Sequence, residues 1–156
     1  IINEMYSHLV YELCEPELPN TLFFLKKLGL DIVLLTARGS DCHDYLLKTL
    51  KQLNVFPYLM TSCRNHLMGY QDGIIYCQGS HKGNILKLFL EQHDYNPEQI
   101  IFVDDKLKNL EHVNEILPQT QLFLCTHQSE NVHLFNQSNK QEVIQEYQDY
   151  LYKKKK

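Results

Sequence analysis

Four polar residues along the chain are of the types that bind phosphate and magnesium ions. Thr36 follows one apolar run, Lys82 follows a glycine-containing loop, and the adjacent carboxylates Asp104 and Asp105 follow a second apolar run. A hydroxyl group and an ammonium group bind phosphoryl oxygens, and one or two carboxylates can hold Mg2+ together with water and a phosphate. The set therefore predicts a site for a phosphorylated ligand and Mg2+.

The acidic pair is the strongest single signal. Asp104 and Asp105 stand side by side at the end of a strand expected at residues 100–104. Neighbouring carboxylates repel one another, and a cation beside them relieves that repulsion. We interpret both as magnesium ligands, with Asn109 as an auxiliary contact to the metal or its water. The alternative is an acidic turn that caps the next helix, with Asn109 as an ordinary helix residue.

The segment Thr36-Ala37-Arg38-Gly39 supplies the second part of the expected site. A hydroxyl group followed by backbone N–H groups, where a strand turns into a helix, can hold a phosphoryl oxygen. We assign Thr36 and Ala37 to phosphate binding. Arg38 is an auxiliary residue that pairs either with substrate or with a surface carboxylate. The alternative is an ordinary strand end, since many strands end in threonine.

Lys82 is the third part, at the start of a helix expected at residues 83–92. A lysine at a helix N-terminus opposes the helix dipole, which costs about 0.3 kcal/mol. A nearby anion would offset this cost, so we assign Lys82 to phosphate binding. The alternative is a surface lysine.

An alternation of strands and helices must position these residues, which predicts the α/β class with a mostly parallel sheet. The unbroken apolar run at residues 32–35 is typical of a strand covered on both faces. Because ligands bind beyond the carboxyl ends of parallel strands, Thr36 and Asp104 should face one crevice. Strands are expected at residues 31–36, 56–61, 73–77, 100–104 and 121–125. Helices are expected at residues 2–13, 19–28, 83–92, 108–116 and 140–152, and from a cap at Ser40 or Asp41 to Asn54.

Composition limits the function classes. A chain of 156 residues with 44% hydrophobic content predicts a single domain, residues 1–156. A net charge of -4, with its only basic block at residues 153–156, argues against a nucleic-acid partner. No apolar run approaches the ~20 residues of a membrane span, so no membrane partner is expected. The five cysteines and eight histidines show no zinc-ligand spacing, and reduced thiols make the cytoplasm the default compartment.

The three segments together resemble the haloacid dehalogenase-like (HAD) superfamily. Leu34-Leu35-Thr36-Ala37-Arg38 is similar to its second motif, His81-Lys82-Gly83-Asn84 to its third, and Ile101-Phe102-Val103-Asp104-Asp105 to its fourth. The resemblance covers about residues 19–125. Residues 31–38 and 100–110 look like a bacterial branch whose members are HAD-like proteins of unknown function. The resemblance implies a three-layer Rossmann-like fold and a Mg2+-dependent phosphatase acting on a phosphorylated small molecule or phosphoprotein.

The first motif of that superfamily is missing. It is an Asp-x-Asp at the end of the first, central strand, and it supplies the nucleophile and the general acid/base. No Asp-x-Asp occurs in the sequence, and Asp31, Asp41 and Asp44 do not fit the role, so we assign no catalytic residue. The resemblance implies that the first strand preceded Ile1 and that the domain is truncated at its amino end. Any targeting signal at that end would have been lost with it, so the compartment stays unknown, with the cytoplasm as the default.

Two interpretations remain open. The chain is either a truncated copy of a larger phosphohydrolase or a degenerate domain that serves as a binding or protein-interaction module. In both cases we expect no Mg2+-dependent phosphatase activity from the chain alone. The superfamily's strand order would place the missing strand between residues 31–36 and 100–104. The chain should then be unstable, pair these strands directly, or borrow a strand from another chain, as in a homo-oligomer formed through the exposed gap.

Overall fold

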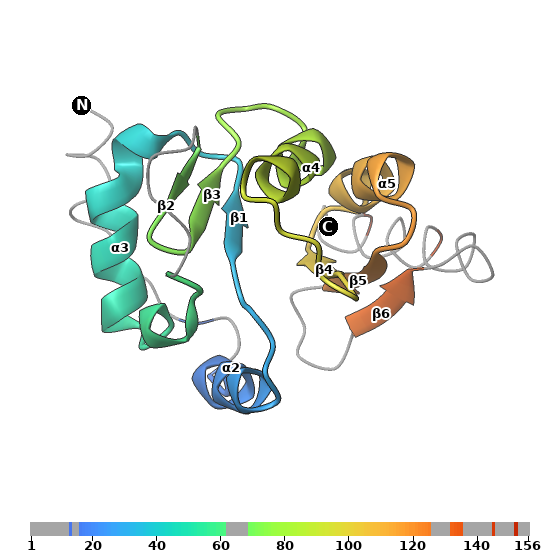
Figure 1. Cartoon of the computed structure of the whole chain (residues 1–156). Coiled ribbons are helices and arrows are strands. Elements are labelled where there is room, and N and C mark those ends of the chain that lie inside the picture. The colour runs from blue at the N-terminus through green and yellow to red at the C-terminus, as the bar shows by residue number, and fades with distance from the viewer. Residues whose placement is uncertain are drawn as a thin grey trace. The chain divides into compact units, whose positions relative to one another are not determined.

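The computed structural model describes Leu13, residues 16–61 and 69–125, the backbone of Val132–Phe135, and the helical residues Gln145 and Tyr152. Its contacts form two compact units, unit 1 (Ile1–Tyr95) and unit 2 (Asn96–Lys156). Each unit combines helices with a small, partly parallel sheet (Figure 1). The α/β class is therefore confirmed at this level, and the prediction of a single domain stays a prediction.

Unit 1 is built on the parallel pairing of β1 (Leu34–Thr36) with β3 (Ile74–Tyr76). In this register Thr36 lies opposite Tyr76, so both strands end at the same edge of the sheet. The two-residue strand β2 (Tyr70–Gln71) pairs antiparallel with the other side of β3. The helical elements of unit 1 are α2 (Leu18–Lys27), η1 (Ser40–Cys42), α3 (His43–Gln52), η2 (Phe56–Tyr58) and α4 (Lys82–Gln92), of which η1 and η2 are 3-10 helices.

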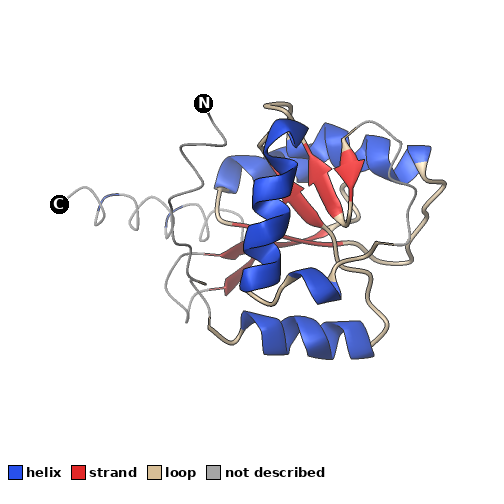
Figure 2. Cartoon of the chain, turned by 90° about the vertical axis from the view of Figure 1, so that its left-hand side faces the viewer, coloured by secondary structure: helices blue, strands red, loops and turns tan. Residues whose placement is uncertain are grey.

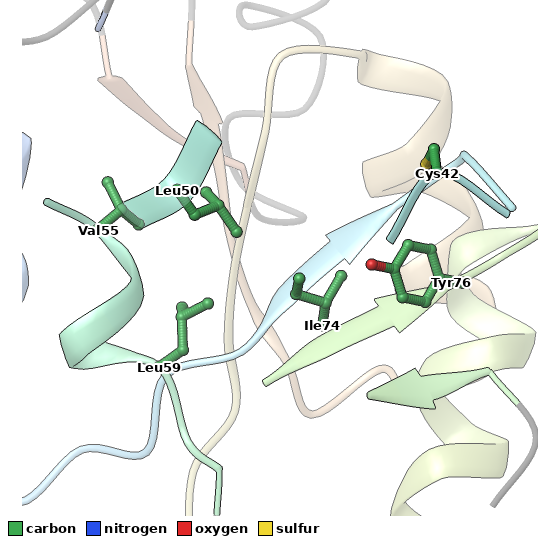
Figure 3. Packing of buried hydrophobic residues seen from close by; sticks show 6 residues of the cluster. All are labelled: Cys42, Leu50, Val55, Leu59, Ile74 and Tyr76. Carbon is green, nitrogen blue, oxygen red and sulfur yellow. The ribbon is translucent and has the colours of Figure 1, made fainter. Parts of the chain in front are cut away.

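Apolar side chains cover both faces of this sheet, with α3 on one side and α4 on the other (Figures 1 and 2). The buried cluster on the α3 side consists of Cys42, Leu50, Val55, Leu59, Ile74 and Tyr76 (Figure 3). The buried cluster on the α4 side consists of Met60, Tyr70, Ile75 and Phe89. Because strand side chains alternate between faces, an apolar run without alternation is what a doubly covered strand requires.

Unit 2 has the order β4 (Ile101–Asp104), α5 (Leu107–Ile116), β5 (Gln121–Cys125) and β6 (Val132–Phe135). β4 and β5 are parallel, and β6 pairs antiparallel with β5. The helix α5 packs against β4 and β5, and its Leu110 and Val113 are completely buried. The side chain of Asn109, also on α5, reaches the carboxylate of Asp104, which places α5 over the face of β4 that carries Asp104.

Most predicted elements have the expected type, with boundaries that differ by a few residues. The predicted helix end at Gly29 is confirmed, because this residue has a φ of 84° and donates its N–H to Lys26 O at 3.0 Å. The strand expected at residues 31–36 is shorter, since Ile32 O accepts the N–H of Met60 instead of a ladder bond. The helix cap at Ser40 or Asp41 is wrong, because η1 occupies these positions and α3 starts after them without a side-chain cap.

The strand expected at residues 56–61 is wrong, because the 3-10 helix η2 starts there with Pro57 in its first turn. The strand β3 was predicted, at residues 73–77, whereas its hairpin partner β2 was not. The turn residues of this hairpin, Asp72 and Gly73, have φ values of 50° and 82°, as a two-residue primed turn requires. A Cβ atom on Gly73 would lie 2.6 Å from Leu59 Cβ, so this turn also needs glycine for space.

The strands β1 and β4, which the resemblance would place on either side of the missing strand, are each the outermost strand of their sheet. Among the described residues, β1 pairs with β3 and β4 pairs with β5, and the two sheets are separate. Direct pairing of the strands expected at residues 31–36 and 100–104 stays a prediction. The helices expected at residues 2–13 and 140–152 lie outside the described residues, apart from Leu13, Gln145 and Tyr152. No helix in the described part of the chain is long and apolar enough to cross a membrane.

Replacing Ile74 by alanine should strongly destabilise the protein. The Ile74 side chain is 0% exposed at the centre of the larger cluster of unit 1. Ile74→Ala should lower the free energy of unfolding by about 2–5 kcal/mol, through lost burial and a residual cavity. Leu28→Ala is the control, since this side chain is 75% exposed, and it should change stability by less than about 0.5 kcal/mol. Urea denaturation followed by circular dichroism measures both, and equal losses would contradict the packing.

Candidate functional site

The loops that follow β1 and β3 are hydrogen-bonded to each other at the carboxyl edge of the sheet of unit 1. This edge carries the predicted phosphate-binding segment from Thr36 to Arg38, and α4 begins beside it with Lys82. The joining backbone bonds run from Cys77 N–H to Thr36 O (2.9 Å), from Gln78 N–H to Arg38 O (3.2 Å) and from Gly79 N–H to Ala37 O (3.1 Å). The structure thus brings the second and third sequence segments to one place in the fold.

The Thr36 hydroxyl has a defined local role. Its Oγ1 accepts a hydrogen bond from the backbone N–H of Arg38 at 3.3 Å, which shapes the turn after β1. A hydroxyl group that accepts one bond keeps its own hydrogen to donate, and a phosphoryl oxygen is an acceptor. Thr36 can therefore serve the turn and a ligand at once.

An acidic side chain lies close to this loop. A Cβ atom built on Gly39 would be 2.6 Å from Asp41 Oδ1, so the carboxylate lies directly against the glycine. Negative charge at this position repels an anion. Phosphate binding here would therefore depend on cationic side chains. Arg38 lies in the loop after β1, and Lys82 is the first residue of α4, which follows the loop after β3. From the sequence, Asp41 was expected only as a helix cap, and its charge beside this loop was not predicted.

The first carboxylate of the acidic pair is held at the start of α5. Asp104 is 7% exposed, and its Oδ1 accepts hydrogen bonds from Lys106 N–H at 2.8 Å and from Asn109 Nδ2 at 2.9 Å. Asp105 is exposed. Lys106 is the N-cap residue of α5, so Asp104 has the helix-end role that was the alternative to metal binding. Asn109 contacts the carboxylate itself.

The two carboxylates fit magnesium better than a metal that needs several protein ligands. Within the described ranges, no three His, Cys, Asp or Glu side chains come together in a way that could hold a metal ion. Mg2+ commonly uses only one or two carboxylates, with water and substrate phosphate as its other ligands. Asp104 and Asp105 offer two adjacent carboxylates at a strand end. Magnesium binding by this pair stays a prediction.

The predicted residues are thus grouped by unit. Unit 1 holds Thr36, Ala37, Arg38 and Lys82 at one sheet edge, and unit 2 holds Asp104, Asp105 and Asn109 at the start of α5. A single pocket that contains all seven residues stays a prediction.

Sequence reasoning missed a buried polar network next to the phosphate loops. The ring of His43, the first residue of α3, lies between Tyr76 Oη at 2.8 Å from Nδ1 and Asp72 Oδ2 at 3.1 Å from Nε2. A neutral ring that donates from Nε2 to the carboxylate accepts the Tyr76 O–H at Nδ1, so every ring nitrogen is satisfied. The partners are 29 and 33 positions from His43, and no local pattern links residues so far apart.

Burial around this network shifts two ionisation equilibria. Desolvation is the main reason that the pKa of Tyr76 is raised well above its ordinary value of 10.0, and negative charge on Cys42 and Asp72 adds to the effect. Burial likewise raises the pKa of the Cys42 thiol, while the charge of Arg38 opposes that rise. Cys42 also donates its Sγ–H to Gly39 O at 3.0 Å. Both groups therefore stay neutral near pH 7, and Cys42 is a packing residue rather than a thiolate nucleophile.

A family model matches residues 3–155, described as a protein of unknown function (DUF2608). The chain belongs to the DUF2608 family. The DUF2608 match extends over both units, so the phosphate loops and the acidic pair lie within one family region. Neither a search of curated proteins nor a search of solved structures found a match to the chain.

Removing the Tyr76 hydroxyl should change how stability depends on pH. At pH 7, Tyr76→Phe leaves Nδ1 of His43 without its buried donor, which should cost about 1–3 kcal/mol. Because the pKa of Tyr76 is raised in the folded state, its neutral phenol favours folding below pH 10.0, and this stabilisation is lost as the pH rises further. The difference in unfolding free energy between the two proteins should therefore shrink above that pH.

Urea titrations at pH 7 and at several pH values above 10 measure this difference. Tyr58→Phe is the matched control, because it removes a phenol that lies outside the His43 network. A difference that stays constant or grows with pH would contradict the placement of Tyr76.

Proposed function

We propose that this DUF2608 chain is a HAD-like domain, of three-layer Rossmann-like architecture, that binds a phosphorylated small molecule or phosphoprotein together with Mg2+. The chain contains no Asp-x-Asp motif, so it binds the ligand without hydrolysing it. The observation that carries the proposal is the hydrogen-bonded pair of loops after β1 and β3. The first loop begins at Thr36, which ends β1, and the second leads to Lys82 at the start of α4. The bonds between the loops therefore hold two separate sequence segments at one edge of the sheet.

Phosphate binding is supported by the donors at this sheet edge. Thr36 offers a hydroxyl hydrogen, and Lys82 stands in the first turn of α4, an 11-residue helix whose N-terminus favours an anion. Lys82 supplies a positive charge that a neutral helix end lacks, and it counters the carboxylate of Asp41 near Gly39. The ligand class follows from this chemistry, because hydroxyl, ammonium and backbone N–H groups are all donors to phosphate oxygens.

Magnesium binding is supported by the position of the acidic pair. Asp104 is the last residue of the parallel strand β4 and Asp105 follows it, so both lie at the carboxyl end of the strand, where ligands of α/β sheets bind. When bound, Mg2+ would neutralise charge on the phosphate of the ligand. The bonds from Lys106 and Asn109 hold the Asp104 carboxylate in a fixed orientation before any metal arrives.

Absence of turnover follows from the absence of a placed nucleophile. Formation of an aspartyl-phosphate needs a carboxylate aimed at the phosphorus atom from the opposite side to the leaving group. Among the described aspartates near the phosphate loops, Asp41 lies against Gly39 and Asp44 is exposed on α3. Neither carboxylate stands at the end of a strand, where this chemistry would require it.

A non-catalytic binding or interaction module without a metal is the second candidate. The bonds that Asp104 accepts at the start of α5 favour it, since they give this carboxylate a structural role that needs no cation. The two candidates differ in one measurable property, which is whether Mg2+ strengthens phosphate binding.

Inorganic phosphate is the probe for the site in unit 1. Calorimetric titration in MgCl2 should show binding by the full chain, and Lys82→Gln should weaken it about tenfold through loss of a charge-assisted bond. Lys87→Gln is the matched control on the same helix, where Lys87 pairs with Glu91 at 3.8 Å, and it should leave the affinity unchanged. Equal affinities for both variants would contradict the role of Lys82.

The same titrations test the metal and the chemistry. Asp104→Asn keeps an acceptor for Lys106 N–H but removes the charge, so it should weaken the binding of Mg2+, measured by titration with MgCl2, about tenfold. Asp94→Asn, at an exposed position, should not. Wild-type protein that binds phosphate equally with and without Mg2+ would favour the metal-free module. Mg2+-dependent hydrolysis of p-nitrophenyl phosphate by the chain alone would refute the missing nucleophile.

A further inference from the structure

The strand β4 has one free edge among the described residues of unit 2. In the parallel register with β5, Ile100 O accepts the N–H of Gln121, and alternate residues of β4 continue this ladder. The N–H and C=O groups of Ile101 and Val103 therefore point away from β5. These backbone groups can pair with another strand.

The side chains at this edge are apolar and exposed. Ile101 is 46% exposed and Val103 is 56% exposed, and both lie on the face of β4 opposite α5. Natural edge strands are usually protected by proline, by lysine or by a bulge. The sequence Ile-Phe-Val-Asp of β4 has no such protection. The other outer strand, β1, differs because its Leu34 and Leu35 pack into the two apolar clusters of unit 1.

We propose that β4 pairs antiparallel with β4 of a second copy of this chain, across a two-fold axis at Phe102. In this register Ile101 lies opposite Val103 of the second copy, and Val103 opposite Ile101. Each opposed pair exchanges both N–H···O bonds, so the outward backbone groups of both strands are satisfied. The two sheets join into one of six strands, three from each copy, and the two-fold closes the assembly as a dimer.

Charged residues just outside β4 also favour pairing with a second copy. When the register is continued past the ends of β4, the exposed Glu98 approaches the exposed Lys106 of the second copy, and this approach occurs twice. Asp104 lies opposite Ile100 and Asp105 opposite Gln99, so neither acidic pair faces the other. Opposite-charge pairs stabilise adjacent strands and like-charge pairs destabilise them. The register therefore places apolar side chains side by side at the centre, with opposite charges just beyond both ends of the paired strands.

Sedimentation of the full chain tests the interface. The wild-type protein should be a dimer, and Ile101→Lys/Val103→Lys should raise the dimer dissociation constant by about tenfold or more, because lysine then opposes lysine at both pairs. Ile116→Lys is the matched control, since Ile116 is a 37% exposed apolar residue on α5 of the same unit. It should leave the dimer intact. A monomeric wild type, or an unaffected double variant, would overturn the proposal.

Mixing two single variants tests the register itself. Ile101→Lys mixed with Val103→Glu places lysine opposite glutamate at one pair and leaves Ile101 opposite Val103 at the other. Ile101→Lys mixed with Ile101→Glu creates no such opposed pair. The first mixture should form heterodimers at least about tenfold more tightly than the second. Equal association in the two mixtures would overturn the two-fold at Phe102. Circular dichroism of each variant confirms that it is folded, and none of these results depends on phosphate binding.

Discussion

The parallel pairing of β1 with β3 is the constraint on which the arrangement of unit 1 depends. Its register places Thr36 opposite Tyr76, so the loops after both strands start at the same level and bond to each other. The same pairing places the Tyr76 hydroxyl where the first residue of α3, His43, can accept its hydrogen. One short ladder therefore fixes the candidate phosphate loops above the sheet and anchors the helix that continues from the first of them.

Unit 2 shows how one side chain can serve structure and chemistry together. The carboxylate of Asp104 closes the start of α5 through Lys106 and Asn109, and it ends a parallel strand, where ligands of such sheets bind. A carboxylate that is already oriented loses less conformational freedom when a cation binds. The bonds that Asp104 accepts from Lys106 and Asn109 are thus compatible with magnesium binding. In the metal-free alternative, the same two bonds explain why a carboxylate is buried at this position.

The sequence was most informative where a local pattern decides the structure. Helical spacing predicted α4 and α5, and the apolar run of β5 predicted that strand with its ends, because burial of one stripe or one run leaves a periodic signal. The two-residue strand β2 is too short to leave such a signal. The strand expected at residues 56–61 was wrong because its apolar residues include Pro57, which lies in the first turn of the 3-10 helix η2. The segments around Thr36, Lys82 and Asp104 could likewise be chosen from their residue types. The His43 network could not be predicted, because its partners Tyr76 and Asp72 are distant in the sequence and meet only in the folded chain.

The central claim is that the hydrogen-bonded loops after β1 and β3 bind phosphate. Nuclear magnetic resonance of the full chain, titrated with inorganic phosphate, tests this claim most directly. The amide signals of residues 36–38 and 78–82 should shift progressively as phosphate is added. Shifts confined to other parts of the chain, with these signals unchanged, would contradict the claim.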